Sequence, residues 1–226
     1  MIDFFCCLFD GKRTTLPAYS GQVGYSPEWA DKLFRAVSRH TNDFIRFVCL
    51  TDQEYQFQTA IEQIPCLDPA EQWGCIMETL NPEFGGNRRI VLGLDTLILG
   101  NIQEICDWPG DVGLLTDPYY PETICNGVGS YSPEACSRLY RSWTEGKKKN
   151  REQWSYKGQL SEMIFLRQEM AEATRLDQVF ADQIQSYKAH YRDHLETQDK
   201  ARIVYFHGRP KMQELHGDDP LLRHWI

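Results

Sequence analysis

Short apolar runs alternate with a well-marked helical segment in the first fifty residues, and this alternation constrains the fold more than any other feature. Residues 2–9 form a continuous apolar run with the length of a buried strand. A polar, glycine-containing loop follows. Ser26-Pro27 then marks a helix start, with serine at the N-cap and proline at the first helical position. A second apolar run covers residues 45–50. A strand, a helix and a strand in this order predict a parallel pair with a right-handed crossover, and hence an α/β fold.

The rest of the chain continues with elements of the same kinds. Helices are expected at residues 70–80, 133–143 and 160–171, and strands at 90–99, 112–116 and 203–206. The sequence contains no internal repeat, low-complexity segment or clear linker. We therefore expect a single domain over residues 1–226.

Charge and cysteine usage exclude some classes of function. The net charge of −8 argues against a large nucleic-acid interface or an anionic-membrane surface, because each needs a basic face. It does not exclude a local basic cleft for a phosphorylated small molecule. The eight cysteines include no C-x-x-C pair, which predicts buried free thiols in a reducing compartment. The first apolar run is too short for a signal peptide or a membrane span, so we expect a cytoplasmic protein.

Asp95 places one carboxylate inside the apolar run 90–99. Burying an unpaired charge costs several kcal/mol (order of magnitude), unless the group is paired or binds a cation. Ligands of open α/β sheets bind at the carboxyl edge, where such a strand ends. Asp95 is therefore a candidate ligand-binding residue; the alternative is a solvated residue at the end of a strand.

A second set of polar side chains follows the last predicted strand. His207 begins a glycine-containing loop that also holds Arg209 and Lys211. An imidazole can bind a divalent cation, and a lysine or arginine can neutralise phosphate oxygens. The alternative is a strand-end histidine in a basic turn. Taken with Asp95, these residues predict a site in which Mn²⁺ or Mg²⁺ is held together with a diphosphate.

Several segments resemble the GT-A-fold glycosyltransferases, most closely the glycogenin and bacterial lipopolysaccharide galactosyltransferase group. Residues 92–102 resemble the strand that carries their D-x-D motif, and residues 207–211 resemble their C-terminal His-x-Gly-x-x-Lys-Pro segment, with proline before lysine here. Residues 25–52 are similar to their first βαβ unit. Residues 126–128 resemble an Asn-Ser-Gly-Val segment, and residues 158–159 are similar to a Gly-Asp-Gln motif. The matches occur in order over most of the chain.

The resemblance implies a GT-A-type fold, with a mixed, mostly parallel sheet flanked by helices. Residues 1–117 would form a Rossmann-like half that binds the nucleotide sugar. Residues 118–226 would form the acceptor side and the segment that binds metal and phosphate. The implied activity is metal-dependent transfer of a sugar from a nucleotide-sugar donor, usually a UDP-sugar, with retention of configuration. The resemblance identifies neither the sugar nor the acceptor.

The resemblance also implies roles for individual residues. It implies that Asp95 and His207 bind Mn²⁺ or Mg²⁺. Leu8, Tyr25, Gly208 and Lys211 would bind the donor, with Lys211 on the diphosphate and with Leu8 and Tyr25 at the nucleobase. Gln159 and Asn126 are the candidate catalytic residues, with Gln159 near the anomeric carbon and Asn126 on the acceptor side. Tyr119 and Tyr120 are candidates for the acceptor site, because exposed aromatic rings stack on sugars.

Three residues depart from the pattern of that group. Gly93 replaces the first acid of D-x-D, Gly158 replaces the acid of Gly-Asp-Gln, and Ile76 replaces a basic residue. Candidates for compensation are Arg88, Arg89 and Glu162. These departures leave open a degenerate domain that binds a sugar nucleotide or a partner without turnover. A nucleotidyltransferase on a related sheet is less favoured, because the chain lacks a glycine-rich, lysine-containing N-terminal loop.

Overall fold

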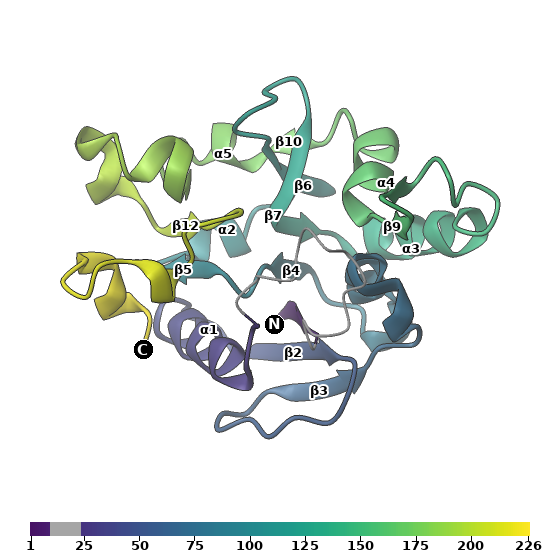
Figure 1. Ribbon diagram of the computed structural model, residues 1–226, viewed down its shortest axis with the longest axis horizontal. Helices are drawn as coiled ribbons and strands as arrows, with labels where there is room; N and C mark the ends of the chain where they lie inside the picture. The colour runs from purple at the N-terminus through teal and green to yellow at the C-terminus, as the bar shows by residue number, and fades with distance from the viewer. Residues whose placement is uncertain (10–23) are drawn as a thin grey trace.

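The structure is a computed structural model that describes residues 1–9 and 24–226, so the polar loop predicted after the first strand lies outside the described residues. Its centre is a seven-stranded sheet with the order β10-β6-β7-β4-β1-β2-β3 (Figure 1). The strands are β1 (Ile2–Leu8), β2 (Ile45–Thr51), β3 (Glu62–Pro65), β4 (Arg89–Leu92), β6 (Val112–Thr116), β7 (Ile124–Tyr131) and β10 (Thr174–Arg175).

The sheet is mixed and mostly parallel, as the sequence predicts. Strand β1 pairs in parallel with β2 and β4, β2 pairs in parallel with β3, and β10 with β6. Only β7 is reversed, because it pairs antiparallel with both of its neighbours, β4 and β6. The other strands therefore all end at one edge of the sheet, which we call the carboxyl edge.

The predicted βαβ unit is confirmed. Helix α1 (Pro27–Arg39) follows Ser26, which is the N-cap residue although its side chain makes no capping hydrogen bond. One face of α1 packs on the sheet through buried residues that include Trp29, Leu33 and Val37. The unit forms because the apolar residues of α1 recur at helical spacing and meet strands that are apolar on both faces.

Helices and irregular segments cover both faces of the sheet. The helices are α2 (Gln103–Cys106), α3 (Pro133–Gly146), α4 (Glu162–Glu169) and α5 (Leu176–Val179), with the 3₁₀ helices η3 (Pro69–Leu80), η4 (Pro82–Phe84), η6 (Leu195–Lys200), η7 (Met212–Glu214) and η8 (Pro220–His224) and the π-helix η5 (Tyr187–Tyr191). A small sheet has the order β11-β12-β5, with β11 (Ile184–Ser186), β12 (Ile203–Tyr205) and β5 (Thr96–Ile98), and β8 (Ser155–Tyr156) forms a hairpin with β9 (Gln159–Leu160).

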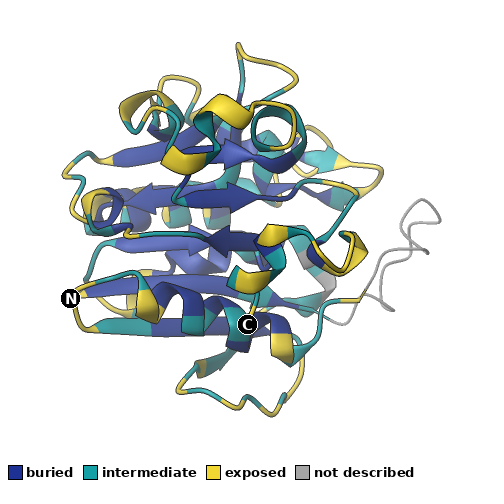
Figure 2. Ribbon diagram, turned by 90° about the vertical axis from the view of Figure 1, so that its left-hand side faces the viewer, coloured by how far each residue is buried: buried dark blue, intermediate teal, exposed yellow. Residues whose placement is uncertain are grey.

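The core has one layer on each side of the sheet, as Figure 1 shows with α1 on one side and α3 and α4 on the other. Along β1, Phe4 and Cys6 belong to the layer that includes α1, and Phe5 belongs to the layer that includes α3. Burial on both faces explains why β1 is apolar at every position except Asp3 rather than alternating. Figure 2 shows the strands as largely buried, with exposed residues in the loops and on outer helix faces.

Three predicted elements differ from the structure. The single strand expected over residues 90–99 is two strands, β4 and β5, which belong to different sheets and are separated by a turn that holds Asp95. The helix expected at 70–80 is the 3₁₀ helix η3, and the helix expected at 160–171 is shorter because its first residues form β9. A pattern of apolar residues shows burial but does not show where a strand changes partners.

The prediction of buried free thiols is confirmed. All eight cysteines are free, and all but the half-buried Cys7 are buried. Burial raises the pKa of the Cys106 thiol to about 12 and that of Cys136 to about 11, so both stay protonated at neutral pH. Over the described residues, no helix combines the length and the apolar character needed to cross a membrane.

Asp31 fixes α1 to the segment that follows β2, and this contact can be tested. Its carboxylate is 2% exposed and accepts hydrogen bonds from the backbone N–H groups of Gln58 and Thr59 and from the Thr59 hydroxyl. Asp31→Ala should lower the free energy of unfolding by about 2–4 kcal/mol, because these donors lose their acceptor. Urea denaturation measures the change. The exposed Asp193→Ala is the control and should leave stability unchanged; an equal change in both variants would contradict the prediction.

Candidate active site at the carboxyl edge of the sheet

The pairing of two short strands brings the predicted site residues together. Strand β12 runs antiparallel to β5, with Tyr205 opposite Thr96. The residues that flank this pair therefore also meet, and the Phe206 N–H donates to the Asp95 carbonyl at 2.9 Å. Since Asp95 follows β4 and His207 follows Phe206, both lie at the carboxyl edge of the main sheet.

Asp95 lies at the centre of a polar cluster. Its Oδ2 atom accepts a hydrogen bond from the Tyr25 hydroxyl at 2.9 Å and forms an ion pair with the Lys211 ammonium. The side chains of Lys211 and Asp95 are only 15% and 17% exposed. Burial, and secondarily the Asp95 charge, raises the pKa of Tyr25, so that its hydroxyl remains a donor. The alternative reading of Asp95 as a solvated residue at the end of a strand is thus excluded.

Because Gly93 has no side chain, the Asp95 carboxylate can lie directly beside it. A Cβ atom on Gly93 would lie 2.8 Å from Asp95 Oδ1, which is closer than real Cβ contacts. A side chain at 93 would therefore collide with the Asp95 carboxylate where it now lies. If Asp95 is the second acid of D-x-D, as the resemblance implies, this site has one carboxylate where that group has two.

His207 is held by contacts on several sides. Its Nε2 atom lies 2.6 Å from the Ser186 hydroxyl, and its ring and the Tyr119 ring make an edge-to-face contact at a centroid distance of 5.1 Å. Burial, and then the charges of Lys188 and Lys211, lowers the pKa of His207 to about 4. The imidazole is therefore neutral at pH 7, which is the form that can bind a metal ion.

Asp95 and His207 are the predicted ligands of a divalent cation. No cluster of three or more histidine, cysteine, aspartate or glutamate side chains with metal-binding geometry exists among residues 1–9 and 24–226. Among the described residues, the side chains of Tyr25 and Lys211 both bond to Asp95 through its Oδ2 atom. The Ser186 side chain bonds to His207 through its Nε2 atom. One carboxylate oxygen and one ring nitrogen are thus left for a cation, whose other ligands would have to come from a bound diphosphate.

Gly208 and Leu8 lie where a ligand at this edge could meet backbone atoms. Gly208 has a φ of 64°, in the left-handed region that favours glycine. Leu8 is the last residue of β1 and is fully buried, so only its backbone could contact a nucleobase. The roles predicted for both residues stay predictions.

Asn126 and Glu162 form a second polar group beside the cluster. The Asn126 amide on β7 donates to Glu162 Oε1 at 3.3 Å. Glu162 is the first residue of α4 and is 8% exposed, and burial raises its pKa to about 7. The residue after Asn126 contacts the turn that holds Asp95, because the Gly93 N–H donates to the Gly127 carbonyl at 3.4 Å. The Asn126–Glu162 pair therefore lies close to this turn.

From the sequence, Glu162 is only a candidate for compensating the departures at Gly93, Gly158 and Ile76. Its contact with Asn126 shows where it lies, and the compensating role stays a prediction. The signal that points to Glu162 is an acid directly after Ser161, which caps a helix that is otherwise largely apolar on its buried side.

The segment that resembles Gly-Asp-Gln is a hairpin in this structure. Lys157 and Gly158 form the two-residue turn between β8 and β9, with φ values of 51° and 82°. Glycine at 158 is therefore explained by the turn. Gln159 Oε1 is buried without a hydrogen-bond partner, and within the described part of the chain no hydrogen bond joins Gln159 to Asp95 or Asn126. Its predicted place beside the sugar stays a prediction.

Arg88 and Arg89 do not compensate for the missing charges. They lie at the amino end of β4, whereas Asp95 follows its carboxyl end. The buried Arg89 guanidinium donates to the carbonyl of Thr79 at 2.6 Å, and Arg88 donates to the carbonyl of Gly110 at 2.8 Å. Both arginines are therefore structural.

Tyr119 lies at the site, and its loop is fixed by an ion pair. Asp117 pairs with Arg167 at 2.6 Å and accepts hydrogen bonds from the backbone N–H groups of Tyr119 and Tyr120. Tyr119 and Tyr120 are 57% and 60% exposed. The contact of Tyr119 with His207 places one of the two predicted aromatic residues beside the candidate metal ligand.

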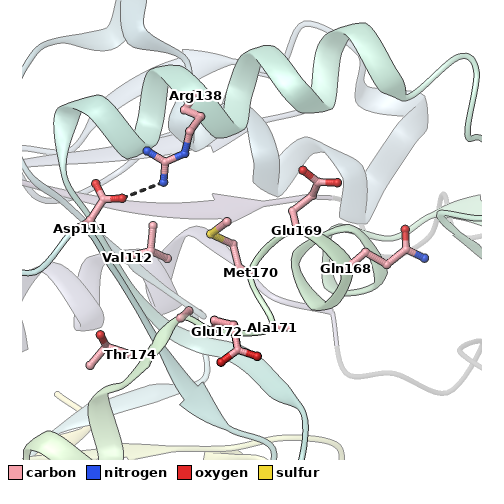
Figure 3. Close-up of a pocket in the computed structure, with 10 residues that line it drawn as sticks. Asp111, Val112, Arg138, Gln168, Glu169, Met170, Ala171, Glu172 and Thr174 are labelled. Carbon is pink, nitrogen blue, oxygen red and sulfur yellow. Dashed lines mark hydrogen bonds and ion pairs between the residues drawn. The ribbon is translucent and has the colours of Figure 1, made fainter.

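A separate hollow of ≈ 380 Å³ lies near the amino end of β6, between α3 and the segment that follows α4 (Figure 3). An ion pair between Arg138 and Asp111 closes one side at 2.7 Å. Its lining residues are Asp111, Val112, Arg138 and residues 168–174. None of the predicted site residues lines it, so this hollow is distinct from the candidate active site.

Comparison with known proteins supports the fold. No protein-family model matches the sequence, and no curated protein matches it. The galactosyltransferase LgtC, solved in complex with donor and acceptor sugar analogues, has a TM-score of 0.61 at 12% identity over 98% of this chain and 93% of that chain. The bifunctional glycosyltransferase WbbM gives 0.63 at 10% identity, and GlyE from Streptococcus pneumoniae TIGR4 gives 0.61 at 12% identity.

The alignment with WbbM covers 93% of this chain and 46% of the WbbM chain. The alignment with GlyE covers 99% of this chain and 59% of the GlyE chain. Identities this low show a shared fold. Because the mixed sheet, its flanking layers and nearly the whole length of the chain all match, the chain has the GT-A fold of these glycosyltransferases.

Proposed function

We propose that the protein transfers a sugar, with retention of configuration, from a nucleotide-sugar donor, a UDP-sugar, to an acceptor. The observation that carries this proposal is the convergence of Asp95, Lys211, Tyr25 and His207 at the carboxyl edge of a GT-A sheet. A carboxylate, an ammonium and an imidazole at the edge where α/β sheets bind nucleotides are suited to a diphosphate with a divalent cation.

Lys211 is the residue that would bind the diphosphate. In the structure its ammonium is divided between the Asp95 carboxylate and the Phe206 carbonyl, the latter at 3.3 Å. In this proposal it exchanges the Asp95 oxygen for a phosphate oxygen when the donor binds. A fixed ammonium beside the leaving diphosphate stabilises the negative charge that develops as the sugar–phosphate bond breaks.

Asp95 and His207 would hold Mn²⁺ or Mg²⁺, because each keeps one donor atom that described residues do not use. Bound there, the cation would neutralise part of the charge on the departing diphosphate. Ser186 would keep the His207 ring oriented, since ligating histidines normally engage a hydrogen-bond partner through their other nitrogen.

Glu162 and Asn126 would face the reacting sugar. Positive charge develops at the anomeric carbon during glycosyl transfer, and a nearby carboxylate stabilises it. Glu162 is the buried carboxylate that contacts Asn126, the residue predicted to line the acceptor side. Its pKa of about 7 would make the charged form increase over the neutral pH range.

Binding and turnover of UDP-sugars test this function. UDP with Mn²⁺ should raise the free energy of unfolding by about 2.7 kcal/mol at 100 times its dissociation constant, because the ligand binds only the folded state. A UDP-sugar should be hydrolysed slowly without an acceptor. If no nucleotide stabilises the protein with any divalent cation, the proposed function is wrong.

Gly93 favours a second candidate function, a domain that binds a sugar nucleotide without turnover. One carboxylate holds a cation less firmly than two. The two functions are separated by donor hydrolysis in the wild type and in His207→Ala. Hydrolysis that disappears in the variant supports the enzyme, whereas binding of UDP with no hydrolysis in either protein supports the binding domain.

A further inference from the structure

The pairing of β11 with β12 places a second lysine, Lys188, at the candidate site. Strand β11 pairs in parallel with β12, with Ser186 opposite Tyr205, so the residues after both strands leave at the same edge. The Tyr187 ring stacks on the Phe206 ring at a centroid distance of 4.5 Å. Lys188 follows Tyr187, just as His207 follows Phe206. Lys188 therefore lies beside the segment that starts at His207.

The Lys188 ammonium lies against Gly208. A Cβ atom on Gly208 would be 3.2 Å from Lys188 Nζ, so the missing side chain gives the ammonium access to this backbone. The same ammonium lies 5.9 Å from the centroid of the Tyr119 ring, which also contacts His207. Lys188 and His207 therefore both lie next to the Tyr119 ring, and, besides burial, the charge of Lys188 contributes to lowering the pKa of His207.

The charge of Lys188 is not balanced within the described part of the chain, where no carboxylate pairs with its ammonium. Lys211, by comparison, pairs with Asp95. Lys188 is half-buried, so its ammonium is partly removed from water. A half-buried cation with no acid beside it is suited to an anionic ligand, since charge-assisted bonds to phosphate oxygens replace the lost hydration.

We propose that Lys188, whose ammonium lies beside Gly208, is a second binding residue for the diphosphate in addition to Lys211. This inference rests on the proposed function and adds a residue to its donor site. In the proposed site, glycine at position 93 leaves one acid fewer to hold a cation. A second ammonium, beside that of Lys211, would supply positive charge to the diphosphate directly.

Calorimetric titration with UDP, uridine and inorganic pyrophosphate tests the role of Lys188. Lys188→Met keeps the length of the side chain and removes the charge, and should weaken the binding of UDP and pyrophosphate about 10- to 100-fold. Uridine binding should not change, because uridine has no phosphate. Lys188→Arg should restore most of the affinity, and the exposed Lys149→Met should bind like the wild type. Thermal melting checks that each variant is folded.

The outcomes separate this inference from the proposed function. If Lys188→Met binds UDP as tightly as the wild type, the inference is overturned and the proposed function is unaffected. Equal loss of uridine and UDP binding would also overturn it, because a general change of the site would then explain the result. A wild type that binds neither UDP nor pyrophosphate overturns both.

Discussion

Replacing Asp95 with asparagine is expected to lower the rate of sugar transfer about 100- to 1,000-fold while the protein stays folded. Asparagine has the same shape and keeps an oxygen that can accept the Tyr25 hydroxyl. It removes the negative charge that pairs with Lys211 and that would bind a cation. Initial rates of donor hydrolysis, together with titration of Mn²⁺ in the presence of UDP, measure both effects.

Asp43→Asn is the matched control for this experiment. Asp43 is an exposed aspartate that precedes β2, at the amino end of the strands, and accepts a hydrogen bond from Gln103 at 2.8 Å. Its substitution should leave rate and cation binding unchanged. If Asp95→Asn transferred sugar at the wild-type rate, the ion pair with Lys211 would serve only to hold the C-terminal segment in place, and a cation would not be bound by Asp95.

Replacing Glu162 with glutamine should change activity and stability in opposite directions. Burial raises the pKa of Glu162 from 4.5 to about 7. The folded state then binds the proton more strongly than the unfolded state, so the stability due to this group falls as the pH rises from about 4.5 to about 7. Above pH 7 the penalty is complete, at up to about 3 kcal/mol. Glutamine carries no charge, so at pH 8 the variant should be more stable than the wild type.

The same substitution should lower the transfer rate at pH 8 by about 100-fold, because the carboxylate that stabilises the reacting sugar is lost. The wild-type rate should rise with pH through about 7 as Glu162 ionises, and this rise should be absent in the variant. Urea denaturation and rate profiles at pH 5 to 8 provide both readouts.

Glu169→Gln, at the other end of α4, is the control for Glu162→Gln. Glu169 accepts a hydrogen bond from Ser142 at the exposed end of the helix. It should show neither the gain in stability at pH 8 nor the loss of rate. A Glu162→Gln variant with wild-type activity would mean that Glu162 only fixes Asn126 and the start of α4.

The first βαβ unit could be predicted from the sequence because its signals are local. Helical spacing of apolar residues, Ser26-Pro27 at the helix start and apolar runs of strand length each depend on neighbouring residues. Local signals also single out Asp95, an acid inside the apolar run 90–99, and His207, which follows the run 203–206. Their roles as metal ligands stay predictions.

The contacts of these residues are decided by pairing between distant segments. The run at 90–99 gives no local sign that it divides between two sheets, yet this division turns Asp95 out of the strand and brings it beside Phe206. Lys188 reaches the site because β11 pairs with β12, and Glu162 reaches Asn126 because α4 packs on β7.

The sequence by itself determined the first βαβ unit, the strands at 112–116 and 203–206 and the residue types available for chemistry, because their conformation and burial follow from local spacing. Only the tertiary structure decided which charges meet. The physical reason is that an ion pair such as that of Asp95 with Lys211 depends on distances between segments more than a hundred residues apart, which no local pattern records.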